Sequence, residues 1–238
     1  MQRSFTTLAL FSSLVLVMIA CGSDDGQKAN TKTEPTRATE SAQKVKKVPE
    51  PGQTLAVGTE YVTTEFKPRF SFRVADKGWE VVGPEITDIM DIAQPEPFIT
   101  ISFTNPQKIY DPKRPTEQVA MPEPKDWVAW FQNHPHLKSG KMAPVTIGGV
   151  SGVQFESELS SAPRKYPEYC RPVPCVPLWP LSDGGSFDAF LGDPDLVTIV
   201  EVAGETVIID ITGQADKFEE QLPKAKKVLE TVEWKAAS

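Results

Sequence analysis

Histidine and cysteine are scarce in this sequence, whose 238 residues include two histidines and three cysteines. This scarcity restricts the catalytic and metal sites that the chain can form. A Ser-His-Asp triad would have to use His134 or His136. A zinc site needs three or four protein ligands, and the neighbouring pair Cys170 and Cys175 alone does not supply them.

The chain also lacks an excess of positive charge and a long apolar run. It holds 25 Lys and Arg against 32 Asp and Glu, with a net charge of -7. Nucleic-acid binding needs clustered basic residues, so we expect no nucleic acid as a partner. The apolar stretch Thr6–Ala20 has fifteen residues, which is fewer than the ~20 that a helix needs to cross a bilayer.

The beginning of the chain has the organisation of an export signal. Arg3 supplies a positive charge, an apolar stretch follows, and Ala20 is small enough for a signal peptidase. The next residues, Met18-Ile19-Ala20-Cys21, resemble the lipobox of bacterial lipoproteins, with Met in place of the usual Leu. The resemblance implies cleavage before Cys21 and acylation of its thiol, so that membrane lipid is a partner. The alternative is an ordinary buried cysteine at the end of an uncleaved helix.

The resemblance also gives an expected location and domain organisation. Two or three acyl chains hold a protein stably on a bilayer, so we expect an extracytoplasmic protein, lipid-anchored to the cell membrane. Because Gly22 and not Asp follows the cysteine, the family sorting rule implies the outer membrane if the cell has two. Residues 1–20 are then the signal peptide. Residues 21–54 hold few large apolar side chains and are expected to be a disordered tether. A single domain follows over 55–238.

The pattern of the domain indicates many short strands and few helices. Alternating or β-branched runs predict strands at 60–66, 69–74, 78–82, 88–93, 98–105, 143–149, 152–159 and 232–234, and a hairpin over 195–213. The strand at 78–82 is expected to be the return strand of a hairpin with the preceding one, and Gly148-Gly149 is suited to a tight turn. Helices are predicted over 124–135, with Asp126 in the first turn, and over 215–232. Pro223 should kink the second helix or begin a new one. The fold class expected is α+β, with an antiparallel sheet and a few packed helices.

Several of these segments together resemble a known fold. The strand run FSFRV followed by GW, the first helix, the segment PVTIGGVSGVQFE and the closing amphipathic helix are similar to the PsbP-like sandwich, and to LpqN-type exported lipoproteins. The resemblance covers about residues 60–234. It implies an accessory or binding protein and not an enzyme.

A proline-rich segment contains the two remaining cysteines, Cys170 and Cys175. Outside the cytoplasm such a pair is expected to be a disulfide. We interpret it as a structural clip, because the spacing is not C-x-x-C and no basic group lies beside it in the sequence.

The same segment contributes to a candidate binding surface. An aromatic side chain near a rigid loop can bind a sugar, a peptide or a protein. The candidates are Tyr166, Tyr169, Trp179 and Trp79, although core packing is the favoured alternative for the two tryptophans. Trp127, Trp130 and Trp234 are expected in the core.

The other polar motifs favour structural roles. His134 and His136 are interpreted as an exposed helix end and not as metal ligands, and Gly149–Gly152 as a β-turn and not as a nucleophile elbow. Four aspartates are interpreted as an acidic surface loop, since their spacing is not that of an EF-hand: Asp183, Asp188, Asp193 and Asp195. We expect no metal and no cofactor.

The functional expectation is therefore a non-catalytic binding or accessory module of the cell envelope. Its partner, besides membrane lipid, would be an envelope protein, a glycan or a small ligand. The alternative is an envelope hydrolase that uses a histidine or carboxylates, for which the sequence offers no convincing nucleophile–base pair.

Overall fold

The computed structural model describes residues 45–161, 165–171 and 173–236. The chain divides into two compact units, Met1–Ser41 and Ala42–Ser238. Only the second unit contains described residues, so the predicted signal peptide, Cys21 and the tether up to residue 44 lie outside them. Within the described ranges, no helix is long and apolar enough to cross a bilayer.

Strands dominate the second unit. They are β1 (Lys46–Lys47), β2 (Glu60–Val62), β3 (Phe70–Arg73), β4 (Glu80–Val81), β5 (Ile89–Pro95), β6 (Phe98–Thr104), β7 (Lys108–Tyr110), β8 (Ala120–Pro122), β9 (Leu137–Ser139), β10 (Ala143–Ile147), β11 (Val150–Leu159), β12 (Cys175–Pro180), β13 (Ser186–Phe190), β14 (Pro194–Val202), β15 (Glu205–Gly213) and β16 (Glu233–Trp234). The helices are α1 (Trp127–Asn133), α2 (Phe218–Leu229) and the 3-10 helix η1 (Glu168–Cys170).

One large sheet organises these elements. Its eight strands include the ordered path β10-β11-β14-β15-β6-β5-β4, with β9 also paired to β11, and all of its pairs are antiparallel. A smaller sheet has the order β1-β2-β3-β16, and β12–β13 and β7–β8 form two-stranded sheets. The prediction of antiparallel sheet with few helices is confirmed. The described part is more sheet-dominated than a balanced α+β fold.

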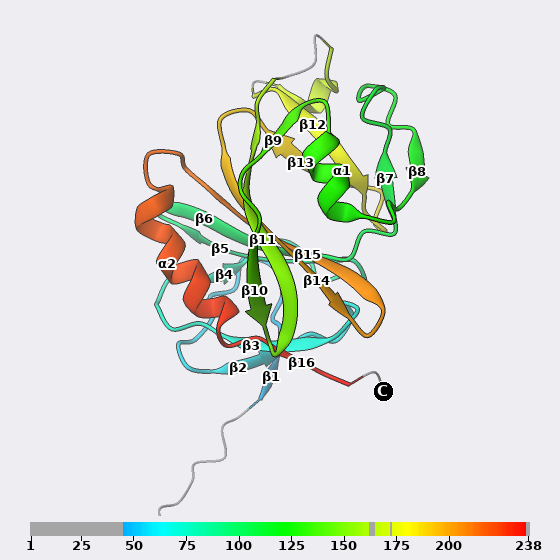
Figure 1. The fold of residues 1–238 in the computed structure, drawn as a ribbon. Coiled ribbons are helices and arrows are strands. Elements are labelled where there is room, and N and C mark those ends of the chain that lie inside the picture. Colours follow the sequence, from blue (N-terminus) through cyan, green and yellow to red (C-terminus); the bar gives the residue numbers. More distant parts are fainter. Residues whose placement is uncertain (1–44, 162–164, 172, 237–238) are drawn as a thin grey trace, which may run out of the picture. The chain divides into compact units, whose positions relative to one another are not determined.

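Two hydrophobic cores lie on opposite faces of the large sheet. The first fills the space between this sheet, the small sheet and α2, as Figure 1 shows for the elements involved. The second joins the other face of β11, β14 and β15 to α1 and the β12–β13 hairpin. Alternation explains this division, because successive residues of a strand point to opposite faces. Ile209 and Ile211 therefore face the first core, while Ile208 faces the second.

Two tight turns connect neighbouring strands. The β-turn expected over Gly149–Gly152 is wrong, because Val150–Gly152 belong to β11 and the turn lies one step earlier. Gly148 and Gly149, at φ 57° and 80°, join β10 to β11. A Cβ atom on Gly148 would lie 2.7 Å from Cδ1 of Trp234, so glycine is required there by close approach as well as by φ. Ala203 and Gly204, at φ 54° and 87°, form the two-residue bend between β14 and β15.

The structure corrects three expectations. The folded part begins before Leu55, since β1 pairs with β2 and the Gly52 amide donates to the Val81 carbonyl. The strand over 78–82 pairs with β5 and not with its predecessor in the chain. Pro223 does not begin a new helix, because α2 continues through it. The proline-rich segment forms β12, which the sequence pattern did not predict, because alternation is masked there by Pro177 and Pro180.

Candidate functional site

A row of polar side chains crosses the second face of the large sheet. The strand registers place Asp91 of β5 beside Ser102 of β6, and Ser102 beside Asp210 of β15. Further along β15, Thr212 is paired with Asp195 of β14. Asp210 and Thr212 are two residues apart, so they share a face. The sheet therefore brings three aspartates together, one from β5 and two from the β14–β15 hairpin, which is distant from β5 in the sequence.

A fourth aspartate closes the group from the opposite side. Asp188 belongs to β13, and with the sheet aspartates it lines a cavity of about 280 Å³. We call this space the aspartate cavity. Its lining consists of Asp91, Asp188, Asp195, Asp210, Ser102, Ser186, Thr212, Ile89, Leu181, Phe187 and Phe190. No Lys, Arg or His belongs to this lining, so no described positive charge balances the four carboxylates within it.

Two of these carboxylates have unused hydrogen-bonding capacity. Asp210 is only 5% exposed, and among the described residues its side chain has no hydrogen bond or ion pair. Oδ1 of Asp91 is buried without a hydrogen-bond partner in the same part of the chain. A buried polar atom without a partner costs free energy comparable to a lost hydrogen bond. The pair therefore offers acceptors that are not used within the described fold.

Burial raises the pKa of every aspartate in the cavity. Burial raises the pKa of Asp91 to about 6, although a hydrogen bond from Ser102 lowers it in part. It also raises the pKa of Asp188 to about 6, although hydrogen bonds from Ser186 and Tyr169 lower it in part. The pKa of Asp195 rises to about 7. That of Asp210 lies well above its ordinary value, because burial is joined by repulsion from Asp195 and Asp91. Perturbed carboxyl groups that share a cavity are typical of functional sites.

The β12–β13 hairpin covers the cavity and is fixed at both ends. At one end, Cys170 and Cys175 form a disulfide with a Cα–Cα distance of 5.3 Å. Near the other, the Ser182 hydroxyl and amide donate to the Asp88 carboxylate at 2.6 Å and 2.8 Å, which ties the turn to the start of β5. Between them, the side chains of Trp179 and Phe187 stack at 4.7 Å. The disulfide clip thus belongs to the element that holds Asp188 over the sheet.

Tyr169 connects the disulfide segment to the cavity. Its hydroxyl donates to Oδ1 of Asp188 at 3.3 Å and lies 3.1 Å from the Ser186 hydroxyl, while Gln118 donates to it at 2.9 Å. The Ser186 hydroxyl donates to the same Asp188 oxygen at 2.9 Å. Asp188 is therefore oriented by two hydroxyl groups, one from its own strand and one from η1.

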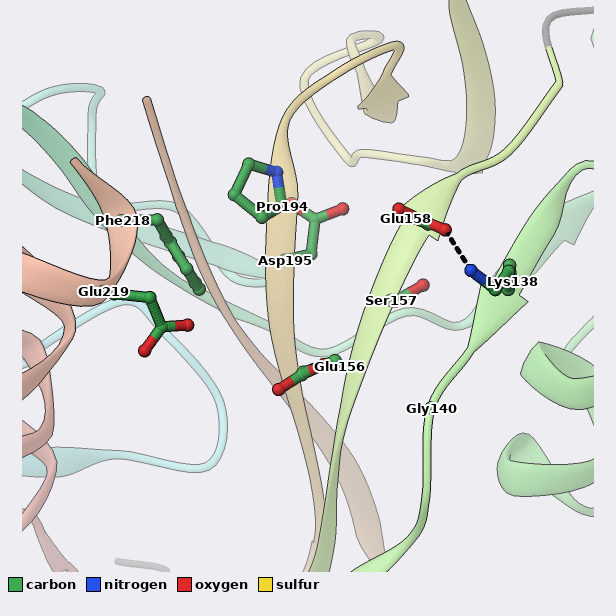
Figure 2. Close-up of a pocket in the computed structure, with 9 residues that line it drawn as sticks. All are labelled: Lys138, Gly140, Glu156, Ser157, Glu158, Pro194, Asp195, Phe218 and Glu219. Carbon is green, nitrogen blue, oxygen red and sulfur yellow. Dashed lines mark hydrogen bonds and ion pairs between the residues drawn. The ribbon is translucent and has the colours of Figure 1, made fainter. Parts of the chain in front are cut away.

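A second hollow lies on the opposite face of the sheet, toward α2. Figure 2 shows the carboxylates of Glu219 from α2 and Glu156 from β11 directed into the space between helix and strand. Its volume is about 210 Å³. Nζ of Lys138 lies 2.7 Å from a carboxylate oxygen of Glu158 on its rim, so this charge is already paired. The two central glutamates are exposed, and water can solvate them, which makes this groove the weaker candidate.

The residues predicted to bind a ligand are divided by the structure. Trp79 is 0% exposed and Trp179 is 1% exposed, so neither belongs to an exposed platform, and core packing applies to both. Tyr166 is half-buried, whereas Tyr169 is 53% exposed. Of the four candidates, Tyr169 contacts the aspartate cavity through Asp188, and Trp179 supports the covering hairpin from within the core.

The two histidines lie at and just beyond the end of α1. His134 is 6% exposed, so the expected exposed helix end is wrong for this residue. Burial, with a smaller contribution from the neighbouring His136, lowers the pKa of His134 to about 4. In the described ranges, no hydroxyl or thiol side chain hydrogen-bonds to either imidazole. The same ranges contain no group of three or more His, Cys, Asp or Glu arranged to hold a metal ion.

Sequence patterns identified only part of the cavity. The acidic segment expected to be a surface loop instead places Asp188 on β13 and Asp195 on β14, both facing the cavity. Asp91 and Asp210 were not singled out. A signal existed, because each is a lone charge inside an apolar strand run, IMDIA and IIDIT. Such a residue is expected to be buried with a partner or in a site.

Comparisons with known proteins find several similar solved structures, including the two that follow. No protein-family model matches the chain, and no curated protein sequence is detectably similar to it. The chain is similar to LpqN of Mycobacterium tuberculosis, described as involved in cell envelope biogenesis, at 12% identity and a TM-score of 0.33, over 70% of this chain and 83% of that one. It is also similar to the cyanobacterial PsbP of Synechocystis at 8% identity and a TM-score of 0.36, over 76% and 95%. Because both TM-scores are low, we base the functional proposal on the residues of this chain.

Proposed function

We propose that this protein is an extracytoplasmic, lipid-anchored binding module of the cell envelope, with a PsbP-like or LpqN-type domain, and that the aspartate cavity is its ligand site. The observation that carries the proposal is Asp210, which is almost completely buried, faces a cavity and has no partner among the described residues. A buried carboxyl group without a partner lowers the free energy of unfolding relative to an apolar residue at the same position, so the stability of the fold does not explain its presence.

Two further features support the proposed location. The lipobox resemblance at Met18–Cys21 implies export and acylation of Cys21. The disulfide between Cys170 and Cys175 is of the kind that persists in oxidising compartments. The proposed role is binding and not catalysis, and among the described residues no nucleophile hydrogen-bonds to an imidazole.

The experiment is a thermal-unfolding screen of the full-length chain in detergent against a small panel of probes. The panel contains putrescine, tetramethylammonium, calcium chloride, glucose, succinate and triglycine. A probe present at a hundred times its dissociation constant should raise Tm by roughly 5–10 °C. We expect at least one probe to do so with the wild type and to lose the effect with Asp210→Asn.

The matched control is Asp216→Asn, which removes the same charge from an exposed position. This variant should respond to probes as the wild type does. If no probe raises Tm, or if the responding probe acts equally on Asp210→Asn, the cavity is not the ligand site and the proposal is wrong.

A further inference from the structure

The composition of the aspartate cavity restricts the ligand chemistry. Four carboxylates and three hydroxyl groups line it, and the remaining lining residues are apolar. An anionic ligand would face like charges in a partly desolvated space, where repulsion is stronger than in water. A neutral ligand would leave every ionised carboxylate of the cavity without a balancing charge. A cation is the ligand class that resolves both problems.

The spacing of the carboxylates distinguishes between kinds of cation. A bare metal ion needs several oxygens converging within about 2–2.6 Å of one point, and no such group of three carboxylates occurs among the described residues. Asp91 and Asp210 flank Ser102 on neighbouring strands, which separates their Cα atoms by about 10 Å. The acceptors are therefore distributed around a space of about 280 Å³, which is much larger than one ion.

The covering hairpin adds apolar and aromatic surface. Phe187 and Phe190 of β13 and Leu181 of the preceding turn line the same cavity. Aliphatic carbon can pack against these side chains, and an ammonium group is attracted to an aromatic face. The cavity therefore combines carboxylate acceptors on the sheet with apolar surface on the hairpin.

We infer that the aspartate cavity binds a small organic cation carrying one or two ammonium groups, with Asp210 and Asp91 as the principal acceptors. The inference rests on the proposed function and specifies its ligand class. One ammonium group donates to the Asp210 carboxylate and a second to Oδ1 of Asp91, the oxygen without a hydrogen-bond partner among the described residues, and the carbon chain lies against Phe187 and Phe190. Charge-assisted hydrogen bonds of this kind are about twice as strong as neutral ones.

The test is calorimetric titration of the full-length chain in detergent with putrescine, using 1,4-butanediol as a neutral analogue of the same length and calcium chloride as a metal probe. Putrescine should bind the wild type and Asp216→Asn equally. It should bind Asp210→Asn and Asp91→Asn at least tenfold more weakly, and the diol should not bind. Both variants replace a buried charge by an isosteric neutral amide, and their cooperative unfolding is verified first.

The alternative outcomes separate the two proposals. Binding of calcium without binding of putrescine would mean that the ligand is a metal ion and not an organic cation. Equal binding of the diol and putrescine would mean that charge has no role in recognition. Either result overturns this inference but leaves a binding function. Absence of binding by putrescine, together with an Asp210-dependent response to glucose, succinate or triglycine in the thermal screen, would also overturn the ligand class alone. No response to any probe would overturn both.

Discussion

The side chain of Asp210 lies in an electrostatically unfavourable environment. It is buried, it has no described partner, and it interacts unfavourably with Asp195 and Asp91. Asp188 of β13 shares the cavity with it. All four carboxyl groups have a higher pKa in the folded state than in the unfolded chain. At these four groups the folded state therefore binds more protons between about pH 4 and pH 7, so their contribution to the free energy of unfolding falls as the pH rises through this range.

At the residue scale, we expect Asp210→Asn to unfold at higher urea concentration than the wild type at pH 7.5, by at least about 1 kcal/mol in free energy of unfolding. At pH 4 the two proteins should be equally stable, because the aspartate is then protonated. Urea denaturation between pH 4 and pH 8, with Asp216→Asn as the control, measures this difference.

His134 acts in the opposite direction and does not disturb the comparison. Its pKa is lowered to about 4 in the folded state, so it removes stability as the pH falls from about 6.5 toward 4. The wild type and Asp210→Asn share this contribution, and their difference isolates the aspartate. A variant less stable than the wild type at pH 7.5 would mean that the Asp210 carboxylate has a stabilising partner in the folded state.

At the element scale, the β12–β13 hairpin links the disulfide to the site. Its strand β13 presents Asp188 and Phe187 to the cavity, and its contacts with the sheet come through Asp88–Ser182 and the second core. The disulfide closes a loop of six residues at the beginning of β12. Loss of this closure increases the entropy of the unfolded chain and also frees one end of the hairpin.

We expect the double variant Cys170→Ser with Cys175→Ser to lose about 2 kcal/mol of stability and to bind putrescine more weakly than the wild type. Urea denaturation and calorimetry measure the two effects. The wild type treated with reductant is the matched control and should behave like the variant. If reduction changes neither stability nor binding, the hairpin is held by its other contacts and the clip has no role in the site.

The structure also clarifies which features sequence patterns can predict. Most strands of the large sheet, the first helix with its Asp126 cap and the Gly148–Gly149 turn follow from local signals, whereas the short strand β9 does not. The aspartate cavity does not, because it depends on the register of β5, β6 and β15 and on the hairpin that covers them. Local patterns contain the alternation of each strand but not the identity of its neighbours.

At the scale of the whole molecule, we propose a lipid-anchored N-terminal segment followed by a binding domain. The acidic chain, the lipobox resemblance at Met18–Cys21 and the disulfide agree with a protein that works outside the cytoplasm. Within the described residues the structure gives no helix able to cross a membrane. We propose, from the lipobox resemblance, that acylation of Cys21 holds the protein at a membrane, since two or three acyl chains provide a stable anchor.

Mass spectrometry of the protein purified from the membrane fraction tests this assignment. We expect a mature chain that begins at Cys21 and carries acyl groups on that residue. Cys21→Ser should lack the modification and the cleavage before residue 21. An unmodified wild-type chain that retains Met1 would contradict the anchor, while leaving the aspartate cavity as a binding site.

The central claim is that the aspartate cavity holds a cationic ligand, and a crystal structure of the full-length protein grown with putrescine tests it most directly. The account predicts putrescine inside the cavity, with an ammonium nitrogen roughly 2.7–3.2 Å from a carboxylate oxygen of Asp210. A cavity that contains only water, or one in which a positively charged side chain of the same protein pairs with Asp210, would contradict it.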